Sequence, residues 1–268
     1  MGFGGAFMRN LLLSVCYDGS RYHGWQIQKN AVSVQEVFQD ALFRILNENC
    51  DIKGCSRTDS GVHANMYCVS VKVNSDIPCE RLQMAMNKFL PADIAVNSSI
   101  EVPLDFHARY SCVGKEYLYK IWNRRVRNPF LVNRAFHYWY PLDLEKLRSA
   151  GQNFIGTHDF TSFCTFDSRN PENMVRTVNS FSIDRSPDGL VTIKVAADGF
   201  LYNMVRIMVG TLLHVSMGKI APGQIRDIIE AKDRALAGPT AVAHGLYLNK
   251  VFYDDNINLG LKLYEEKR

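Results

Sequence analysis

The stretch LLLSVCYD (residues 11–18) is an almost unbroken apolar run, and it predicts a buried strand over about residues 10–17. The polar and aromatic segment GSRYHGWQIQ follows it. After this segment, Ser33 and Glu36 have the spacing of a capping box, and the apolar residues that follow recur at helical spacing. The chain therefore opens with a strand, a loop and a helix.

The first half continues with a short strand expected near 50–54 and a longer strand expected at 67–73. A helix is expected from Pro78, and a further strand near 94–102. In the longer strand, apolar residues alternate with Cys68, Ser70 and Lys72, which predicts that one face is buried and the other solvated. The order of this half is strand, helix, strand, strand, helix, strand.

The second half repeats that order. Its strands are expected at 115–122, 175–183, 190–196 and 245–252, and its helices at 142–154, 201–217 and 222–231. A repeated βαββαβ order predicts an α+β fold of two ferredoxin-like halves with antiparallel sheets and a cleft between them. We expect one domain over residues 8–106 and a second over 107–265.

Composition favours a packed soluble protein, since 47% of the 268 residues are apolar and 11% aromatic. The seven cysteines are odd in number and include no C-x-x-C pair, which argues against a disulfide framework and a structural zinc site. Reduced thiols suit a cytoplasmic protein. The N-terminus lacks a secretory signal, and the apolar stretch 199–218, interrupted by Arg206 and His214, suits a core helix better than a membrane span.

Basic charge is concentrated in one segment. The net charge is only +4, yet residues 115–134 contain six basic residues and one acid. Tyr117 and Trp122 lie among these charges, and aromatic rings beside basic side chains can bind exposed bases and phosphates. A strand with one solvated face would have the same composition. The segment is therefore a candidate nucleic-acid surface or an ordinary exposed face.

The loop GCSRTDSGVHA (residues 54–64) carries the first candidate for chemistry, Asp59. Small and polar residues in this loop suit a tight turn, so Asp59 alone could be a turn former. Arg206 is the only Asp, Glu, Lys or Arg between Asp198 and Lys219, and a charge on such an apolar helix needs a carboxylate or strong hydrogen bonds. Pairing with Arg206 would lower the pKa of Asp59 and keep it ionised as a nucleophile.

Other chemistries have weaker support. His63 could form a dyad with Asp59 that serves Cys55 or a serine as nucleophile, and Cys164 is a second candidate thiol, but no hydrolase motif such as G-x-S-x-G is present. No further ligands stand near His63 at metal spacing. The absence of a P-loop and of G-x-G-x-x-G argues against a nucleotide cofactor.

Five motifs together resemble the TruA family of bacterial tRNA pseudouridine synthases over nearly the whole chain. They occur in the expected order: YDGSRYHGWQIQ, GCSRTDSGVHA, DFHARYSCVGKEYLYKIWN, GFLYNMVRIMVGTL and AGPTAVAHGLYL. The resemblance implies isomerisation of uridine to pseudouridine at positions 38, 39 and 40 of the tRNA anticodon stem-loop. It also implies a homodimer with no metal and no organic cofactor.

The resemblance further implies a role for four residues. Asp59 matches the nucleophile, Tyr117 the tyrosine that stacks on the target base, Arg206 the arginine that pairs with the catalytic Asp, and Arg57 the arginine that assists base flipping. Cys55, Ser56 and Ser60 replace the Ala, Gly and Ala of many members, which are small-for-small changes. The alternative class is a non-catalytic RNA-binding protein of the same topology, in which Asp59 only forms a turn.

Overall fold

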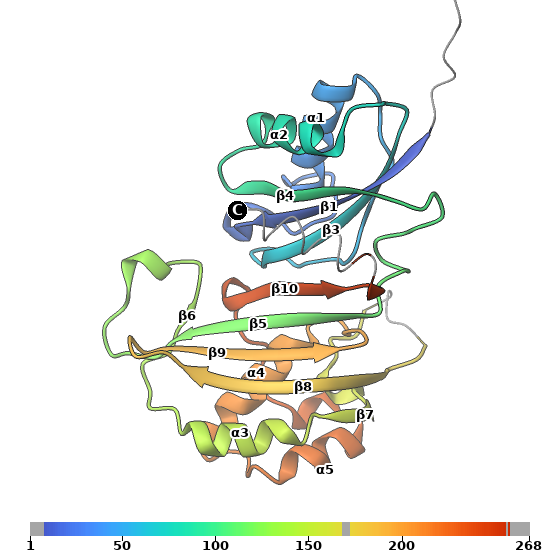
Figure 1. Cartoon of the computed structure of the whole chain (residues 1–268). Coiled ribbons are helices and arrows are strands. Elements are labelled where there is room, and N and C mark those ends of the chain that lie inside the picture. The colour runs from blue at the N-terminus through green and yellow to red at the C-terminus, as the bar shows by residue number, and fades with distance from the viewer. Residues whose placement is uncertain (1–7, 168–171, 256, 258–268) are drawn as a thin grey trace, which may run out of the picture. The chain divides into compact units, whose positions relative to one another are not determined.

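The apolar run near the start of the chain forms β1 (Arg9–Tyr17), in the first of two units of the computed structural model (Figure 1). The structure describes residues 8–167, 172–255 and 257, so residues 1–7 and the predicted domain end at 265 lie outside the described residues. Of the described residues, the first unit takes those up to Val113 and from Leu248 onward. The second takes Gly114–Tyr247.

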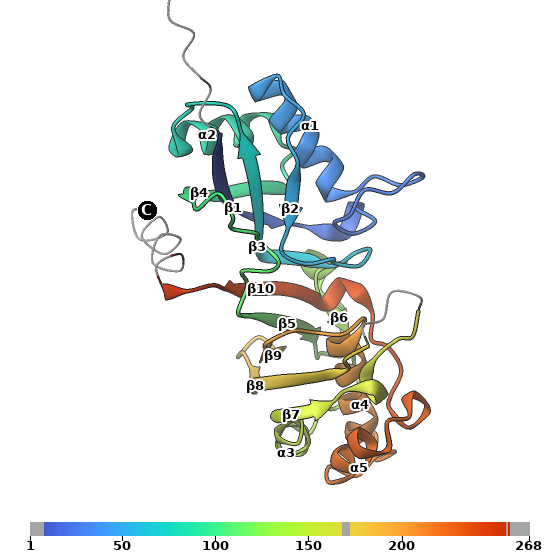
Figure 2. The same ribbon diagram turned by 90° about the vertical axis from the view of Figure 1, so that its right-hand side faces the viewer.

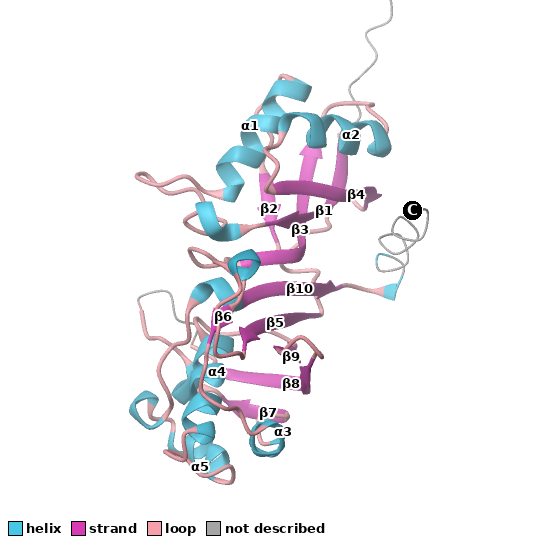
Figure 3. Ribbon diagram, turned by 90° about the vertical axis from the view of Figure 1, so that its left-hand side faces the viewer, coloured by secondary structure: helices cyan, strands magenta, loops and turns pink. Residues whose placement is uncertain are grey.

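The first unit continues through α1 (Val34–Leu46), β2 (Ile52–Gly54), β3 (His63–Val73), α2 (Cys79–Phe89) and β4 (Ile94–Val102). Its strands are ordered β4-β1-β3-β2, and each neighbouring pair is antiparallel. The helices α1 and α2 lie side by side over one face of this sheet (Figure 3). The predicted order of elements is confirmed here.

The capping box predicted at the start of α1 is confirmed. Ser33 Oγ accepts a hydrogen bond from the Glu36 N–H at 3.3 Å, and Glu36 Oε2 accepts one from the Ser33 N–H at 3.4 Å. These bonds satisfy N–H groups that have no partner within the helix. The apolar stripe of α1 buries Phe38 and Leu42, so local and tertiary signals agree on where the helix begins.

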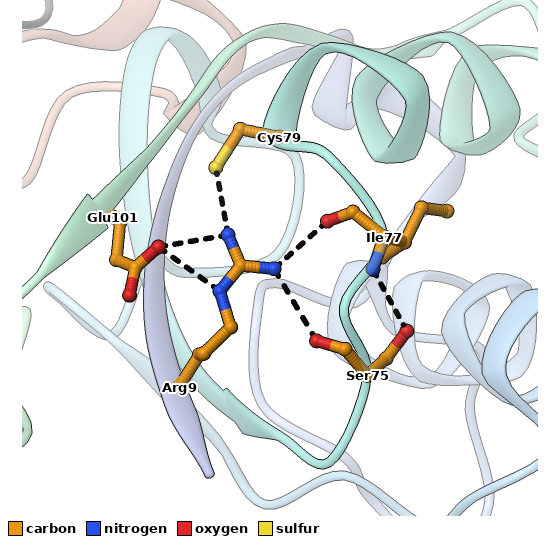
Figure 4. A network of polar contacts seen from close by, with 5 residues as sticks. All are labelled: Arg9, Ser75, Ile77, Cys79 and Glu101. Carbon is orange, nitrogen blue, oxygen red and sulfur yellow. Dashed lines mark hydrogen bonds and ion pairs between the residues drawn. The ribbon is translucent and has the colours of Figure 1, made fainter. Parts of the chain in front are cut away.

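Arg9 ties β1 to β4 and to the segment that enters α2 (Figure 4). Its Nε and NH2 groups donate to Glu101 Oε2 at 2.9 and 2.8 Å, and NH1 donates to the carbonyls of Ser75 and Ile77 at 3.2 and 2.9 Å. NH2 also lies 3.8 Å from Cys79 Sγ. One planar guanidinium thus fixes three segments of the first unit.

The prediction that β3 has one solvated face is wrong at Cys68 and Ser70, which are both buried. A segment distant in sequence covers them, since Ser70 Oγ accepts a hydrogen bond from the Ala108 N–H at 3.0 Å. Tyr253 in turn donates its hydroxyl to the Ala108 carbonyl at 2.7 Å. These contacts place residues 107–113 and the described residues from Leu248 in the first unit, whereas the predicted boundary falls between 106 and 107.

The second unit contains β5 (Gly114–Trp122), β6 (Phe136–His137), α3 (Leu144–Gln152), β7 (Gly156–Asp159), β8 (Val175–Arg185), β9 (Leu190–Ala197), α4 (Met204–Ser216) and α5 (Gln224–Ala231). Its strands are ordered β5-β9-β8-β7 with antiparallel neighbours, and β6 pairs with β5 in parallel. β7 lies beside β8 (Figure 2). β10 (Leu246–Phe252) begins in this unit and continues into residues of the first.

Short 3-10 helices among the described residues are Gly19–Arg21, Pro129–Leu131, Thr161–Phe163, Arg234–Leu236 and Ala243–Gly245. The sequence did not predict them, nor the short strands β6 and β7, because elements this short show no clear period; of the comparably short elements only β2 was predicted.

The predicted core helix at 201–217 is confirmed as α4, which is buried almost all round. Within the described ranges, none of the helices has both the length and the apolar character needed to cross a membrane. None of the seven cysteines, all of which lie among the described residues, takes part in a disulfide bond. The mixed α+β class is confirmed, while two ferredoxin-like halves with a cleft between them stay a prediction.

Candidate active site

Asp59 lies in the loop between β2 and β3 and is half-buried, and the neighbouring Arg57 is exposed. The Val62 N–H donates to the Asp59 carbonyl at 3.1 Å, which closes a four-residue turn. Gly61, the third residue of this turn, has a φ of +75°, a conformation that favours glycine. The predicted turn is confirmed, and it begins at Asp59 itself.

The first motif of the chain holds this loop in place. The Gly61 N–H donates to the Tyr22 carbonyl and the Trp25 N–H to the Thr58 carbonyl, both at 3.2 Å. At Gly24, φ is +85°, and an added Cβ would lie 2.3 Å from the Thr58 carbonyl oxygen. The backbone on both sides of Asp59 is therefore bonded to YDGSRYHGWQIQ, and only glycine fits at position 24.

Aromatic side chains support the beginning of the loop. Trp25 stacks on Tyr67 with ring centroids 4.0 Å apart, and the Tyr67 hydroxyl donates a short hydrogen bond to the Ser56 carbonyl. The Tyr17 hydroxyl and Thr58 Oγ1 are hydrogen-bonded at 2.8 Å. All three aromatic residues are buried. Buried rings with satisfied hydroxyls form a rigid base, which suits a loop that must present a reactive group.

His63 and the candidate thiols have structural surroundings. His63 is 1% exposed, and its Nδ1 accepts the Gly19 N–H at 3.0 Å and lies 3.2 Å from Asp18 Oδ1. Cys55 and Cys164 are fully buried, and burial raises the pKa of the Cys164 thiol. A nucleophilic cysteine needs access and a lowered pKa. The structure thus favours structural roles for these three residues.

Tyr117 lies in β5 of the second unit, paired with Val195 of β9. The residue is 8% exposed, and its ring meets Phe200 edge to face, with centroids 4.9 Å apart and an interplanar angle of 85°. Phe200 stands in the segment before α4. This contact fixes the plane of the Tyr117 ring, which a stacking role would require.

Arg206 lies in the first turn of α4 and is half-buried. Its Nε donates to the Ala241 carbonyl at 2.7 Å and its NH1 to Asn203 Oδ1 at 2.7 Å. The Ala241 N–H donates back to the Arg206 carbonyl at 3.1 Å. The sequence prediction that this charge needs strong hydrogen bonds is confirmed, and two neutral oxygens supply part of them.

The segment that binds Arg206 also binds Tyr119, two residues after Tyr117 in β5. The buried Tyr119 hydroxyl donates to the Val242 carbonyl at 2.8 Å. Burial raises the pKa of Tyr119, and the Arg206 charge partly offsets this rise. The motif AGPTAVAHGLYL therefore links β5 and α4 through consecutive carbonyls, of Ala241 and Val242.

The three arginines at 124, 125 and 127 of the basic segment 115–134 differ in their surroundings. Arg124 donates from Nε to the Asp188 carbonyl at 2.9 Å and from NH2 to the Pro187 carbonyl at 3.0 Å, so it caps the turn between β8 and β9. Arg125 and Arg127 are exposed. Phe130 nearby in sequence is 84% exposed. Arg125 and Arg127 are thus better candidates for phosphate contacts than Arg124.

The four predicted site residues fall into two groups. Asp59 and Arg57 share one loop of the first unit, and Tyr117 and Arg206 lie in the second unit. The Asp59–Arg206 ion pair stays a prediction. Sequence reasoning missed the supporting residues Tyr17, Trp25, Tyr67, Phe200 and Asn203, although all but Tyr67 lie within quoted motifs. Among the described residues, no cluster of three or more His, Cys, Asp or Glu could hold a metal ion.

Comparison with known proteins identifies the class. A family model described as "tRNA pseudouridine synthase" matches residues 13–111 and 150–254, so the chain belongs to that family. Three relatives of this chain carry a more specific name within the family. A protein named tRNA pseudouridine synthase A from Thermoanaerobacter sp. (strain X514) is 46% identical over 246 residues, covering 92% of this chain and 100% of the relative. Proteins with the same name from Acetivibrio thermocellus and Clostridium acetobutylicum are 46% and 45% identical, with the same coverage. The resemblance to the TruA family is confirmed.

Proposed function

We propose that this protein isomerises uridine to pseudouridine at positions 38, 39 and 40 of the tRNA anticodon stem-loop, with Asp59 as the nucleophile. Family membership and the full-length relatives support the reaction class, since all of these relatives are named as tRNA pseudouridine synthases. The observation that carries the site is the loop at Asp59. Its backbone is bonded on both sides to a second motif and rests on buried aromatic rings.

The reaction needs one ionised carboxylate and no cofactor. The bond from C1′ of the ribose to N1 of uracil breaks, the uracil rotates, and a new bond joins C1′ to C5. The hydrogen on C5 leaves as a proton and N1 gains one, so the product is an isomer of the substrate. Asp59 starts the reaction by attacking either C6 of the base or C1′ of the sugar.

The other three residues have supporting roles in this proposal. Arg206 pairs with Asp59 and keeps it ionised. Tyr117 stacks on the target base, and Arg57, which is exposed, assists the base in leaving its helix. We also propose that the two groups face one cleft between ferredoxin-like halves, and that the enzyme is a cytoplasmic homodimer.

The position of the modification can be tested with tRNA transcripts that retain a single uridine among positions 38, 39 and 40. Carbodiimide treatment followed by primer extension marks each pseudouridine as a stop. We expect a stop at the retained position in each of the three transcripts, and none at these positions in a control transcript with cytidine at all three. Pseudouridine formed only elsewhere in the tRNA would contradict the proposed position while leaving the reaction class intact.

A further inference from the structure

Asn203, the residue before α4, departs from the usual chemistry of a helix N-cap. Asparagine at this place normally has extended backbone and accepts a hydrogen bond from an N–H of the first turn. Here φ is +62° and ψ is +6°, in the left-handed region, and the side chain makes no capping bond. The residue therefore lacks both features that make asparagine a good N-cap.

The Asn203 side chain binds Arg206 instead. Its Oδ1 accepts from Arg206 NH1 at 2.7 Å, and its Nδ2 donates to Thr165 Oγ1 at 3.0 Å. A carboxamide has one oxygen acceptor and an NH2 donor, so it can bind a guanidinium and a hydroxyl oxygen at once. An aspartate would lose the donor toward Thr165, and a glycine would lose both bonds.

Arg206 itself is placed against the helix dipole. The first turn of a helix favours negative charge, yet this turn contains Arg206 and no acidic residue. Asn203 and Arg206, three positions apart, thus both depart from the usual chemistry of a helix start, and such departures are expected at functional sites. The bonds to Asn203 and to the Ala241 carbonyl hold the guanidinium at NH1 and Nε, which fixes the plane of the group and the direction of its other donors.

We propose that Asn203 is a positioning residue, which holds the Arg206 guanidinium in the orientation that it needs to pair with the catalytic carboxylate. This inference rests on the proposed function, in which Arg206 is the partner of Asp59. Asn203 does not touch the substrate in this account. It acts through Arg206, and Thr165 holds the Asn203 amide in turn.

Asn203→Gly tests the proposal because glycine adopts positive φ without strain, so the variant should fold as well as the parent. We expect single-turnover pseudouridine formation to fall at least about tenfold while the Kd for tRNA stays unchanged. The matched control is Asn47→Gly, at a second asparagine with positive φ (+52°), which is exposed at the end of α1. It should keep the parental rate.

A double-mutant cycle separates positioning from a general structural role. In an Arg206→Lys background there is no planar fork to orient, so Asn203→Gly should lower the remaining rate by less than about twofold. Thr165→Ser should keep the rate and Thr165→Val should lower it. A parental rate in Asn203→Gly, or losses that multiply with those of Arg206→Lys, would overturn the inference. Full activity of Arg206→Met would instead place the error in the proposed function.

Discussion

Arg206 is the residue at which stability and activity should separate most clearly. Arg206→Met removes a donor from the Ala241 carbonyl, which should lower the free energy of unfolding by about 1–2 kcal/mol. In the proposed mechanism it also removes the partner of Asp59, so we expect the single-turnover rate constant to fall about 100-fold, which corresponds to about 2.7 kcal/mol of barrier. Urea unfolding and single-turnover rates measure the two effects.

Arg234 offers a matched control in the same unit. It is also half-buried and donates from NH1 to the Gly238 carbonyl at 2.9 Å. Arg234→Met should therefore cost similar stability without the loss in rate. Equal losses of rate in the two variants would assign Arg206 a purely structural role.

Single residues were predictable from sequence where their chemistry conflicts with their surroundings. A lone charge on an apolar helix singled out Arg206. The carbonyl of Ala241 and the amide of Asn203 carry no such conflict in sequence, because a backbone acceptor belongs to every residue and an asparagine before a helix suggests an ordinary cap. Their contacts with Arg206 depend on a fold that brings positions 203, 206 and 241 together.

Among the elements, the turn that begins at Asp59 has the clearest conformational requirement. Gly61→Ala places a side chain at φ +75°, which should cost about 1 kcal/mol in unfolding free energy. We also expect at least about tenfold loss of activity, since relief of this strain moves Asp59 and small displacements of reacting groups are costly. Thermal unfolding and initial rates report the two changes.

Gly218→Ala provides the matched control for the turn. Gly218 has a φ of +72°, close to the +75° of Gly61, so the backbone strain of an added side chain is alike, and nothing lies within 4 Å of an added Cβ at Gly218. The control should lose similar stability and keep its activity. If Gly61→Ala lost stability alone, the shape of the turn would not matter for the reaction.

Elements with a clear period were predictable, and their surroundings were not. The capping box located α1 because Ser33 and Glu36 act within one turn of helix. The alternation located the strand at 67–73, although β3 already begins at His63, and it gave the exposure of Cys68 and Ser70 wrongly. The residues that cover them, including Ala108 and Tyr253, are distant in the chain, and no local pattern reports such packing.

For the whole molecule, the excess of positive charge is expected to govern tRNA affinity. The exposed Arg125 and Arg127 are the strongest candidates for phosphate contacts in the basic segment. Replacing both with Gln should weaken binding and reduce the slope of log K against log salt by about 1.5, or somewhat less than one per lost contact. Filter binding between low and moderate salt measures the slope.

The control for charge removes two basic residues that already have carboxylate partners. Lys146 Nζ lies 3.5 Å from Asp143 Oδ2, and Arg148 pairs with Glu145. The double change to Gln at these positions lowers the net charge equally and should leave the slope almost unchanged. The same slope in both double variants would exclude Arg125 and Arg127 from the RNA contact.

The class of the whole fold was predictable from the repeated order of strands and helices, while the grouping of the chain was not. The described residues from Leu248 pack with the first unit, since Tyr253 binds the Ala108 carbonyl and the Val113 N–H binds the Phe252 carbonyl. Order along a chain does not state which unit receives its last strand. The order of elements therefore predicts the class of fold but not the boundary between the two units.

The central claim, that Asp59 starts a uridine isomerisation, is tested most directly by tritium release. A tRNA transcript labelled with tritium at C5 of its uridines must lose that hydrogen to water when C5 is joined to the ribose. We predict release by the parental protein and none above background by Asp59→Asn, with the Kd for tRNA unchanged in the variant. Release by Asp59→Asn at a comparable rate would contradict the role of Asp59. Tight binding by the parental protein without release would instead favour a non-catalytic RNA-binding protein.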